Sequence, residues 1–107
     1  MGFERMVTIG TDHPSLAGHF PGHPVVPAVV MLGEIMDAIR EMTKETIEFV
    51  GMPSAKFMSP LKPGEPLAIK LEQGDGTTEF TCATGSRLIA SGSLRYRMVA
   101  NDSRGDS

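Results

Sequence analysis

Apolar and polar positions divide the chain into one long helical segment and several short alternating ones. Between residues 27 and 46, apolar side chains return every three or four positions, which is the repeat of an amphipathic helix. At about 100° per residue, one stripe of this helix, close to the angle of Ala28, holds Leu32, Ile35, Ile39 and Met42. The opposite arc holds Gly33, Glu34, Asp37, Arg40, Glu41 and Lys44. Since its first turn is apolar all round, we expect the helix to begin in buried surroundings and to show a polar side only later.

Period-two alternation, which is typical of strands, appears in five other segments. They cover residues 6–9, 55–59, 67–73, 79–84 and 87–99. A long loop and the helix follow the first segment, and turns rich in glycine and proline separate the others. In the last one, the two faces hold Leu88, Ala90, Leu94, Tyr96 and Met98 on one side and Arg87, Arg95 and Arg97 on the other. This order predicts an α+β fold, in which an antiparallel sheet of about five strands curls around one central helix.

The length and the ends of the chain indicate one domain. With 107 residues there is room for one hydrophobic core, to which we assign residues 1–100. Residues 101–107 are polar, and we expect a disordered tail there. Between Thr11 and Pro27 the chain is rich in proline, glycine and histidine, which predicts an irregular loop. Pro27 suits the first turn of the following helix, because its φ is fixed and its missing N–H is not needed there.

Composition narrows the range of partners. The net charge is −3, which argues against binding nucleic acid through its phosphates. No apolar run approaches the ~18 residues of a membrane span, and the first residues lack the basic and then apolar order of a signal peptide. The single cysteine, Cys82, excludes an internal disulfide and fits a reducing compartment. We therefore expect a cytoplasmic protein that binds neither nucleic acid nor membrane.

The most informative stretch precedes the helix. Residues 18–27 read Gly-His-Phe-Pro-Gly-His-Pro-Val-Val-Pro, with two histidines among prolines. This stretch resembles the signature of the hot-dog-fold 3-hydroxyacyl-[acyl-carrier-protein] dehydratases of fatty-acid synthesis. Residues 56–65 are similar to the strand and turn that follow the helix in that family, and the order of the predicted elements agrees over residues 3–99. The resemblance implies a hot-dog fold and a lyase of lipid metabolism that uses no cofactor.

The resemblance also implies a mechanism. His19 matches the base that removes the α-proton of a 3-hydroxyacyl thioester, a role that suits imidazole because its pKa lies near working pH. Backbone N–H groups at the helix start polarise the thioester carbonyl, using the positive end of the helix dipole. In the family, a carboxylate on the helix protonates the leaving hydroxyl, and the base and the acid come from different subunits of a dimer. The positions expected to contact the substrate are Phe20, Pro27, Ala28, Val29 and Gly33.

The chain departs from the family pattern at the acid. Gly33 stands at the family's carboxylate position, fourteen residues after His19, and has no side chain. Glu34 is adjacent but about 100° further round the helix, whereas Asp37 is within about 40° of Gly33 but roughly 6 Å further along the axis. We take Glu34 as the candidate acid, with Asp37 or a partner chain as alternatives. Ala28 stands where the family usually has glycine, which keeps the backbone N–H and adds a methyl group.

Two other kinds of chemistry are disfavoured. A metal site would need His13, His19 and His23, but their spacing matches no usual zinc pattern and no cysteine is near, so we expect no metal. Cys82 alternates with Phe80 and Thr84 in a predicted strand and has no neighbouring base, so we expect a buried thiol and not a nucleophile.

The expected function is dehydration of a 3-hydroxyacyl thioester to the trans-2-enoyl thioester, with the acyl group on acyl carrier protein or coenzyme A. One alternative is a non-catalytic or half-catalytic partner subunit, which binds acyl chains or supplies His19 to a site completed by another chain. Another is a hot-dog acyl thioesterase. We expect a homodimer, or a heterodimer with a paralogue that keeps the acid, because so small a chain leaves its central helix short of cover.

Overall fold

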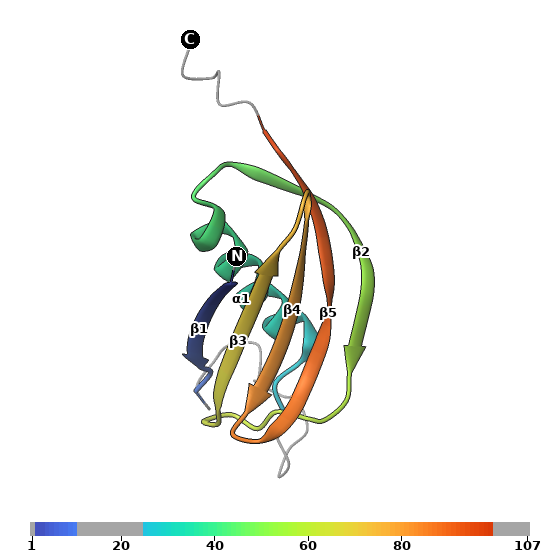
Figure 1. The fold of residues 1–107 in the computed structure, drawn as a ribbon. Helices are drawn as coiled ribbons and strands as arrows, with labels where there is room; N and C mark the ends of the chain where they lie inside the picture. Colours follow the sequence, from blue (N-terminus) through green and yellow to red (C-terminus); the bar gives the residue numbers. More distant parts are fainter. Residues whose placement is uncertain (1, 11–24, 100–107) are drawn as a thin grey trace.

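One antiparallel sheet of five strands, in the order β1-β3-β4-β5-β2, carries a single helix on one face. The computed structural model describes residues 2–10 and 25–99. Its elements are β1 (Gly2–Thr8), α1 (Ala28–Thr43), β2 (Ile47–Phe57), β3 (Pro66–Gln73), β4 (Thr77–Thr84) and β5 (Arg87–Met98). Figure 1 shows α1 crossing the back of the sheet, with β1 and β2 at the two edges. The predicted α+β architecture is confirmed.

The core lies between α1 and the inner face of the sheet. On β3, residues 67, 69 and 71 are buried and alternate with more exposed positions, and on β4 Phe80 and Cys82 do the same. These side chains pack against Ile35 and Ile39, which have no exposed surface. Burying a side chain of this size contributes about 1.5–3 kcal/mol. Hydrophobic burial on one face of a period-two sheet therefore fixes where the helix sits.

The helix starts one residue later than predicted, with Pro27 as its N-cap, and ends three residues earlier. Thr43 is its last residue, because Lys44 adopts a left-handed conformation (φ 55°) and donates its N–H to the Arg40 carbonyl at 2.9 Å. The Thr46 carbonyl then accepts a hydrogen bond from Val99, which draws the chain toward the end of β5. The prediction of a helix to residue 46 is wrong because this C-cap carries no glycine to mark it.

The buried stripe of α1 is rotated from the predicted one. Its buried residues are Met31, Ile35, Ala38 and Ile39. Leu32 and Met42, which were expected on the stripe, are only half-buried and pack at its margin. The first turn is not enclosed, since Val29 is 72 % exposed. The expectation that the helix begins in buried surroundings is therefore wrong for a single chain.

Strand bounds were predicted best in the middle of the sheet. β1 begins at Gly2, earlier than the expected residue 6, because the charged Glu4 and Arg5 interrupt its apolar pattern. β2 begins at Ile47, earlier than the expected residue 55. Its pairing with β5 shifts register twice, between Phe49 and Gly51 and again between Gly51 and Ser54. These irregularities remove the alternation by which a strand is recognised.

A bulge also changes the face of β5. The pairing of β4 with β5 shifts register between Cys82 and Ala83, so that Ile89 has no partner in the ladder. Ile89 is buried, whereas Leu88, which alternation placed on the apolar face, is 43 % exposed. Leu94 and Tyr96 are buried as predicted, while Met98 at the end of the strand is 51 % exposed.

Two predicted segments lie outside the described residues. They are the tail at 101–107 and most of the loop predicted between Thr11 and Pro27, of which residues 25–27 are described and have no regular structure. Among the described residues, α1 is the one helix, and it is too short and too charged to cross a membrane.

Candidate functional site

A shallow cavity of about 250 Å³ opens between the start of α1 and the end of β2. It is lined by Val26, Ala28, Met31, Phe57, Met58, Ser59 and Pro60. Apart from the Ser59 hydroxyl, its side chains are apolar, which suits the acyl part of a substrate. Ala28, a predicted substrate contact, lies in this lining. Phe57 was not assigned to a site from the sequence.

The start of α1, where Ala28 lines the cavity, has backbone N–H groups without intrahelical partners. Pro27 occupies the N-cap in an extended conformation (φ −62°, ψ 147°), and its carbonyl accepts from Val30 at 3.0 Å and Met31 at 3.3 Å. Among residues 2–10 and 25–99, no side chain caps this helix end, and the first turn holds no acidic residue. The amides of Ala28 and Val29 come before the first intrahelical bond, so they and the helix dipole favour a partial negative charge here.

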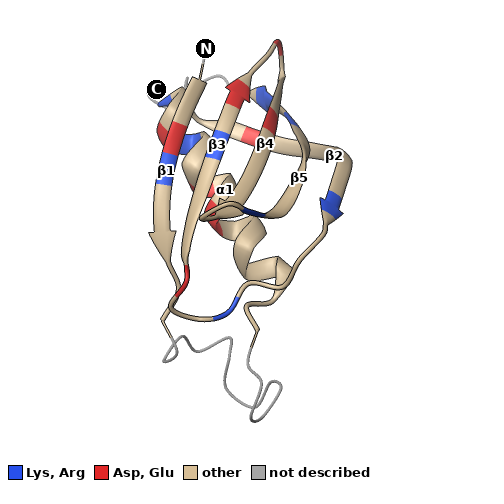
Figure 2. Ribbon diagram, turned by 60° about the horizontal axis from the view of Figure 1, so that its bottom comes forward, with Lys and Arg blue, Asp and Glu red and all other residues tan. Residues whose placement is uncertain are grey.

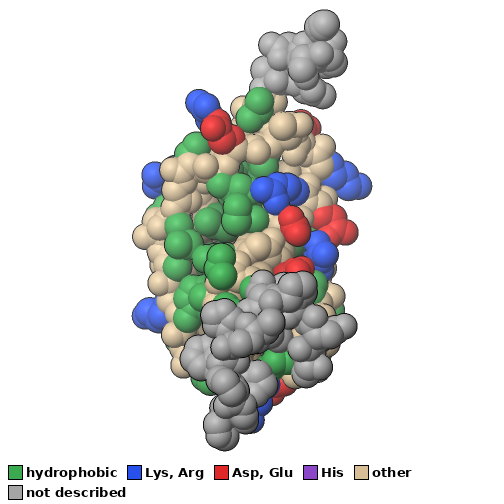
Figure 3. Space-filling view, turned by 180° about the vertical axis from the view of Figure 1, so that it is seen from behind, with side chains coloured by type: hydrophobic (Ala, Val, Ile, Leu, Met, Phe, Trp, Pro, Cys, Tyr) green, Lys and Arg blue, Asp and Glu red, His purple; other side chains and the backbone are tan. Residues whose placement is uncertain are grey.

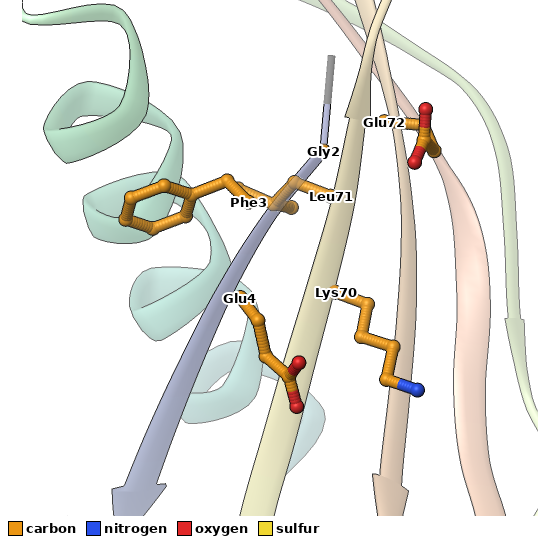
Figure 4. A pocket seen from close by; sticks show the side chains of 6 residues that line it. All are labelled: Gly2, Phe3, Glu4, Lys70, Leu71 and Glu72. Atoms are coloured by element: carbon orange, nitrogen blue, oxygen red, sulfur yellow. The ribbon is translucent and has the colours of Figure 1, made fainter.

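A second depression, of about 370 Å³, lies at the β1–β3 edge. Figure 4 shows that Phe3 points toward α1, whereas Glu4, Lys70 and Glu72 lie on the other side of the strands. Its lining contains none of the predicted site residues. The cavity at the start of α1 is therefore the better candidate site.

Glu34 lies on the β1 side of the helix. Its carboxylate is 3.9 Å from the Arg5 guanidinium, and its side chain is 28 % exposed. Arg5 donates its hydrogen bond to Glu41 instead, at 3.2 Å. The acidic and basic positions of β1 and α1 lie close together in Figure 2. Glu34 is thus half-buried but does not line the cavity at the end of β2.

Gly33 and Asp37 lie on the outer side of α1. A Cβ built on Gly33 meets no atom of the described residues within 4 Å, so a side chain would fit there. Asp37 is bound by Arg40 at 2.9 Å, and its side chain is 58 % exposed. Of the predicted site residues, His19 and Phe20 lie outside the described residues, as do His13 and His23.

Cys82 has no exposed surface, and burial raises the pKa of its thiol to about 12. A thiol that stays protonated at neutral pH is a poor nucleophile. The prediction of a buried, structural cysteine is confirmed.

Comparison with known proteins identifies the family. Residues 3–93 match the family model of the ApeI-like dehydratases. The chain is 35 % identical to the 3-hydroxyacyl-[acyl-carrier-protein] dehydratase FabZ of Chlamydia trachomatis serovar L2, with 94 % of this chain and 73 % of that protein covered.

Among solved structures, the dehydratase heterocomplex ApeI:P from Xenorhabdus doucetiae is similar with a TM-score of 0.81, at 20 % identity over 89 % of this chain and 86 % of that one. The fluoroacetyl-CoA thioesterase FlK is similar with a TM-score of 0.73, at 15 % identity over 97 % of this chain and 89 % of that one. At these identities the structures show the shared fold, which is the predicted hot-dog fold. The chain belongs to the ApeI-like dehydratase family of hot-dog-fold hydro-lyases.

Proposed function

We propose that the chain eliminates water from a (3R)-3-hydroxyacyl thioester carried by an acyl carrier protein or coenzyme A. The observation that carries this proposal is the apolar cavity at the start of α1, beside the amides of Ala28 and Val29. A thioester carbonyl directed at these amides gains hydrogen-bond donors where negative charge develops. The acyl chain then lies against Met31 and Met58, whose flexible thioethers adapt to different shapes. The cytoplasm stays the predicted location, since Cys82 is a free thiol.

In this reaction His19 takes the proton from the α-carbon. The electron pair of that C–H bond forms the new C=C bond, and the bond from the β-carbon to the hydroxyl oxygen breaks. The hydroxyl leaves as water when an acid supplies a second proton. Phe20, Pro27, Val29 and Gly33 complete the proposed substrate contacts.

For an assembly of identical chains, we propose Glu34 as the acid. It is the least exposed of three helix carboxylates, at 28 % against 57 % for Glu41 and 58 % for Asp37. A carboxyl group that is shielded from water suits general acid catalysis better than a fully solvated one. Its 3.9 Å contact with Arg5 is an ion pair that is too long for a hydrogen bond.

The second candidate is a half-catalytic subunit in a mixed dimer. The open space beside Gly33 favours it, because a glycine inside a helix costs about 1 kcal/mol and no described atom requires it. In that assembly this chain supplies His19 and a paralogous chain supplies the carboxylate. The related ApeI:P structure is a heterocomplex, which supports a mixed unit.

We also propose that the chain is at least a dimer. Large apolar side chains are exposed on the first turn of α1 and along β2, namely Val29, Val50, Met52, Phe57 and Met58. Figure 3 shows apolar side chains gathered over one broad area of the helix side. A second subunit that covers this area would enclose both the first turn of α1 and the cavity.

The test is an assay of the purified chain with a 3-hydroxyacyl thioester, in which enoyl formation and free thiol release are followed separately. We expect enoyl thioester without thiol, and a loss of several orders of magnitude in His19→Ala. Thiol release would support the thioesterase. No product from the pure chain, but product after addition of a paralogue with a helix carboxylate, would support the mixed unit.

A further inference from the structure

The connection between β2 and β3, residues 58–65, binds three separate parts of the chain through its backbone. The Gly64 N–H donates to the Ile9 carbonyl at 2.8 Å, and the Val26 N–H donates to the Leu61 carbonyl at 2.8 Å. The Met58 N–H donates to the Ile89 carbonyl at 2.8 Å. Ile9 and Val26 stand on either side of residues 10–25, the stretch of sequence that contains His19. One short connection therefore anchors both flanks of that stretch.

The anchoring points belong to the core. Leu61 has no exposed surface, and Ile9 and Val26 are each 4 % exposed. A buried backbone hydrogen bond is held more strongly than one in water, since breaking it leaves polar groups without partners. The same connection also forms one wall of the candidate site, because Met58, Ser59 and Pro60 line the cavity. Its shape thus governs the cavity and the two flanks together.

Arg87, at the start of β5, holds this connection at two points. Its Nη2 donates to the Pro60 carbonyl at 3.0 Å and to Glu65 Oε1 at 2.8 Å. The same Glu65 oxygen accepts the Lys62 N–H at 2.8 Å. These bonds, from the Lys62 amide first and then from Arg87, lower the pKa of the Glu65 carboxyl, which is therefore ionised at neutral pH.

We propose that Arg87 and Glu65 are positioning residues of the dehydratase site: by holding the β2–β3 connection they set the cavity wall and both flanks of the stretch that contains His19. This inference rests on the proposed role of His19. The pair is half-exposed, and such ion pairs contribute little to stability. A small displacement of a reacting group, however, costs about 10²-fold in rate. The pair should therefore matter more for turnover than for folding.

The kinetic test compares Arg87→Met with Arg97→Met. Arg97 is the matched control, because it forms an exposed ion pair with Glu48 on the same sheet, at 2.7 Å, and touches neither the cavity nor the connection. The probe is (3R)-3-hydroxybutyryl-N-acetylcysteamine, a thioester without a carrier. We expect kcat to fall about tenfold or more in Arg87→Met, with a smaller change in KM, partial rescue in Arg87→Lys and no change in Arg97→Met.

Hydrogen exchange gives a readout independent of activity. In Arg87→Met and in Glu65→Gln, the amides of Val26 and Gly64 should exchange faster, while amides in the centre of β4 keep their wild-type protection. Unchanged exchange at Val26 and Gly64 overturns the proposal. So does an equal loss of turnover in Arg97→Met, or a loss confined to a carrier-bound substrate, which would indicate carrier docking at Arg87. If the wild-type chain dehydrates no thioester, the proposed function fails, and the exchange data alone decide the anchoring.

Discussion

The Glu34 carboxylate and the Arg5 guanidinium lie 3.9 Å apart, across the contact between α1 and β1. Arg5 is shared, because it also donates a hydrogen bond to Glu41, further along the helix. Glu34 therefore belongs to the β1 side of α1, while the cavity opens on the β2 side. The identity of the acid is the main chemical question that follows.

The first prediction concerns Glu34 as the acid. Glu34→Gln should lower turnover at least about tenfold, because general acid groups contribute about 10²–10⁴ and the amide has no proton of comparable acidity to give. The measurement is the rate of enoyl formation across a pH series. Asp37→Asn is the control and should keep wild-type turnover. Full activity in Glu34→Gln would remove Glu34 from the mechanism.

The second prediction concerns the space at Gly33. For the mixed-dimer candidate, Gly33→Glu should raise the activity of the pure chain at least about tenfold, since a carboxylate then stands fourteen residues after His19, and a built Cβ meets no described atom. Gly33→Gln has the same shape without the acid and should give no gain. Equal activity in the two variants would mean that this position does not supply the proton.

The third prediction is an assembly larger than a monomer. At micromolar concentration, light scattering should give at least twice the 11.5 kDa of one chain. Val29→Asp should shift the mass toward one chain, because it places a charge on the most exposed apolar residue of the first helical turn. Leu88→Asp, at an exposed apolar residue outside the cavity lining, is the control and should keep the wild-type mass. A wild-type mass of 11.5 kDa would contradict the dimer.

The fourth prediction contrasts two glycines. A Cβ on Gly92 would lie 2.2 Å from the Ser54 carbonyl oxygen and 2.8 Å from the Ala55 Cα, so β2 has to move to admit it. Gly92→Ala should therefore lower the free energy of unfolding by about 1–3 kcal/mol. Gly33→Ala should raise it by about 1 kcal/mol, because alanine is the better helix former and the space is open. Chemical denaturation followed by far-UV circular dichroism measures both.

The fifth prediction follows from the Cys82 thiol. Its pKa is about 12 in the folded chain, whereas an exposed thiol ionises near a pKa of about 8.5. The unfolded state therefore loses its proton first, and this contribution to stability, complete below about pH 8, declines as pH rises from there toward 12. Chemical denaturation should show that the free energy of unfolding of the wild-type chain is lower at pH 10 than at pH 7. Cys82→Ala should lack the part of this decrease that comes from the thiol. Native protein should also resist iodoacetamide at pH 8, and rapid labelling would contradict the burial.

The fold could be predicted from the sequence where the repeat of apolar residues along an element matches the side chains that the structure buries. β3 and β4 alternate without interruption, and α1 begins directly after Pro27. Prediction failed where a local irregularity hides the period. Ile89 occupies a bulge, so every position before it changes face, and Lys44 ends the helix in a left-handed conformation that is more typical of glycine.

Of the predicted substrate contacts, Ala28 lies in the lining of the cavity, but most of the cavity walls could not be assigned from the sequence. Ala28 and the helix start were assigned from the motif and the helical period. Met58 and Pro60 reach the cavity because the β2–β3 connection folds back over the start of α1, which depends on hydrogen bonds from Arg87 and Val26. Such long-range contacts leave no period in the sequence.

The irregular middle of β2 has a consequence for solubility. A regular edge strand exposes a row of unpaired N–H and C=O groups. Another chain can pair with these groups, and such pairing leads to aggregation. In β2 the two register shifts fall between Phe49 and Ser54, and Pro53, which has no N–H, lies within the second of them. Regular pairing remains at the two ends of β2, over residues 47–49 and 54–57. Strand addition along the whole of this border is therefore interrupted in the middle, while short and defined pairing stays open at either end.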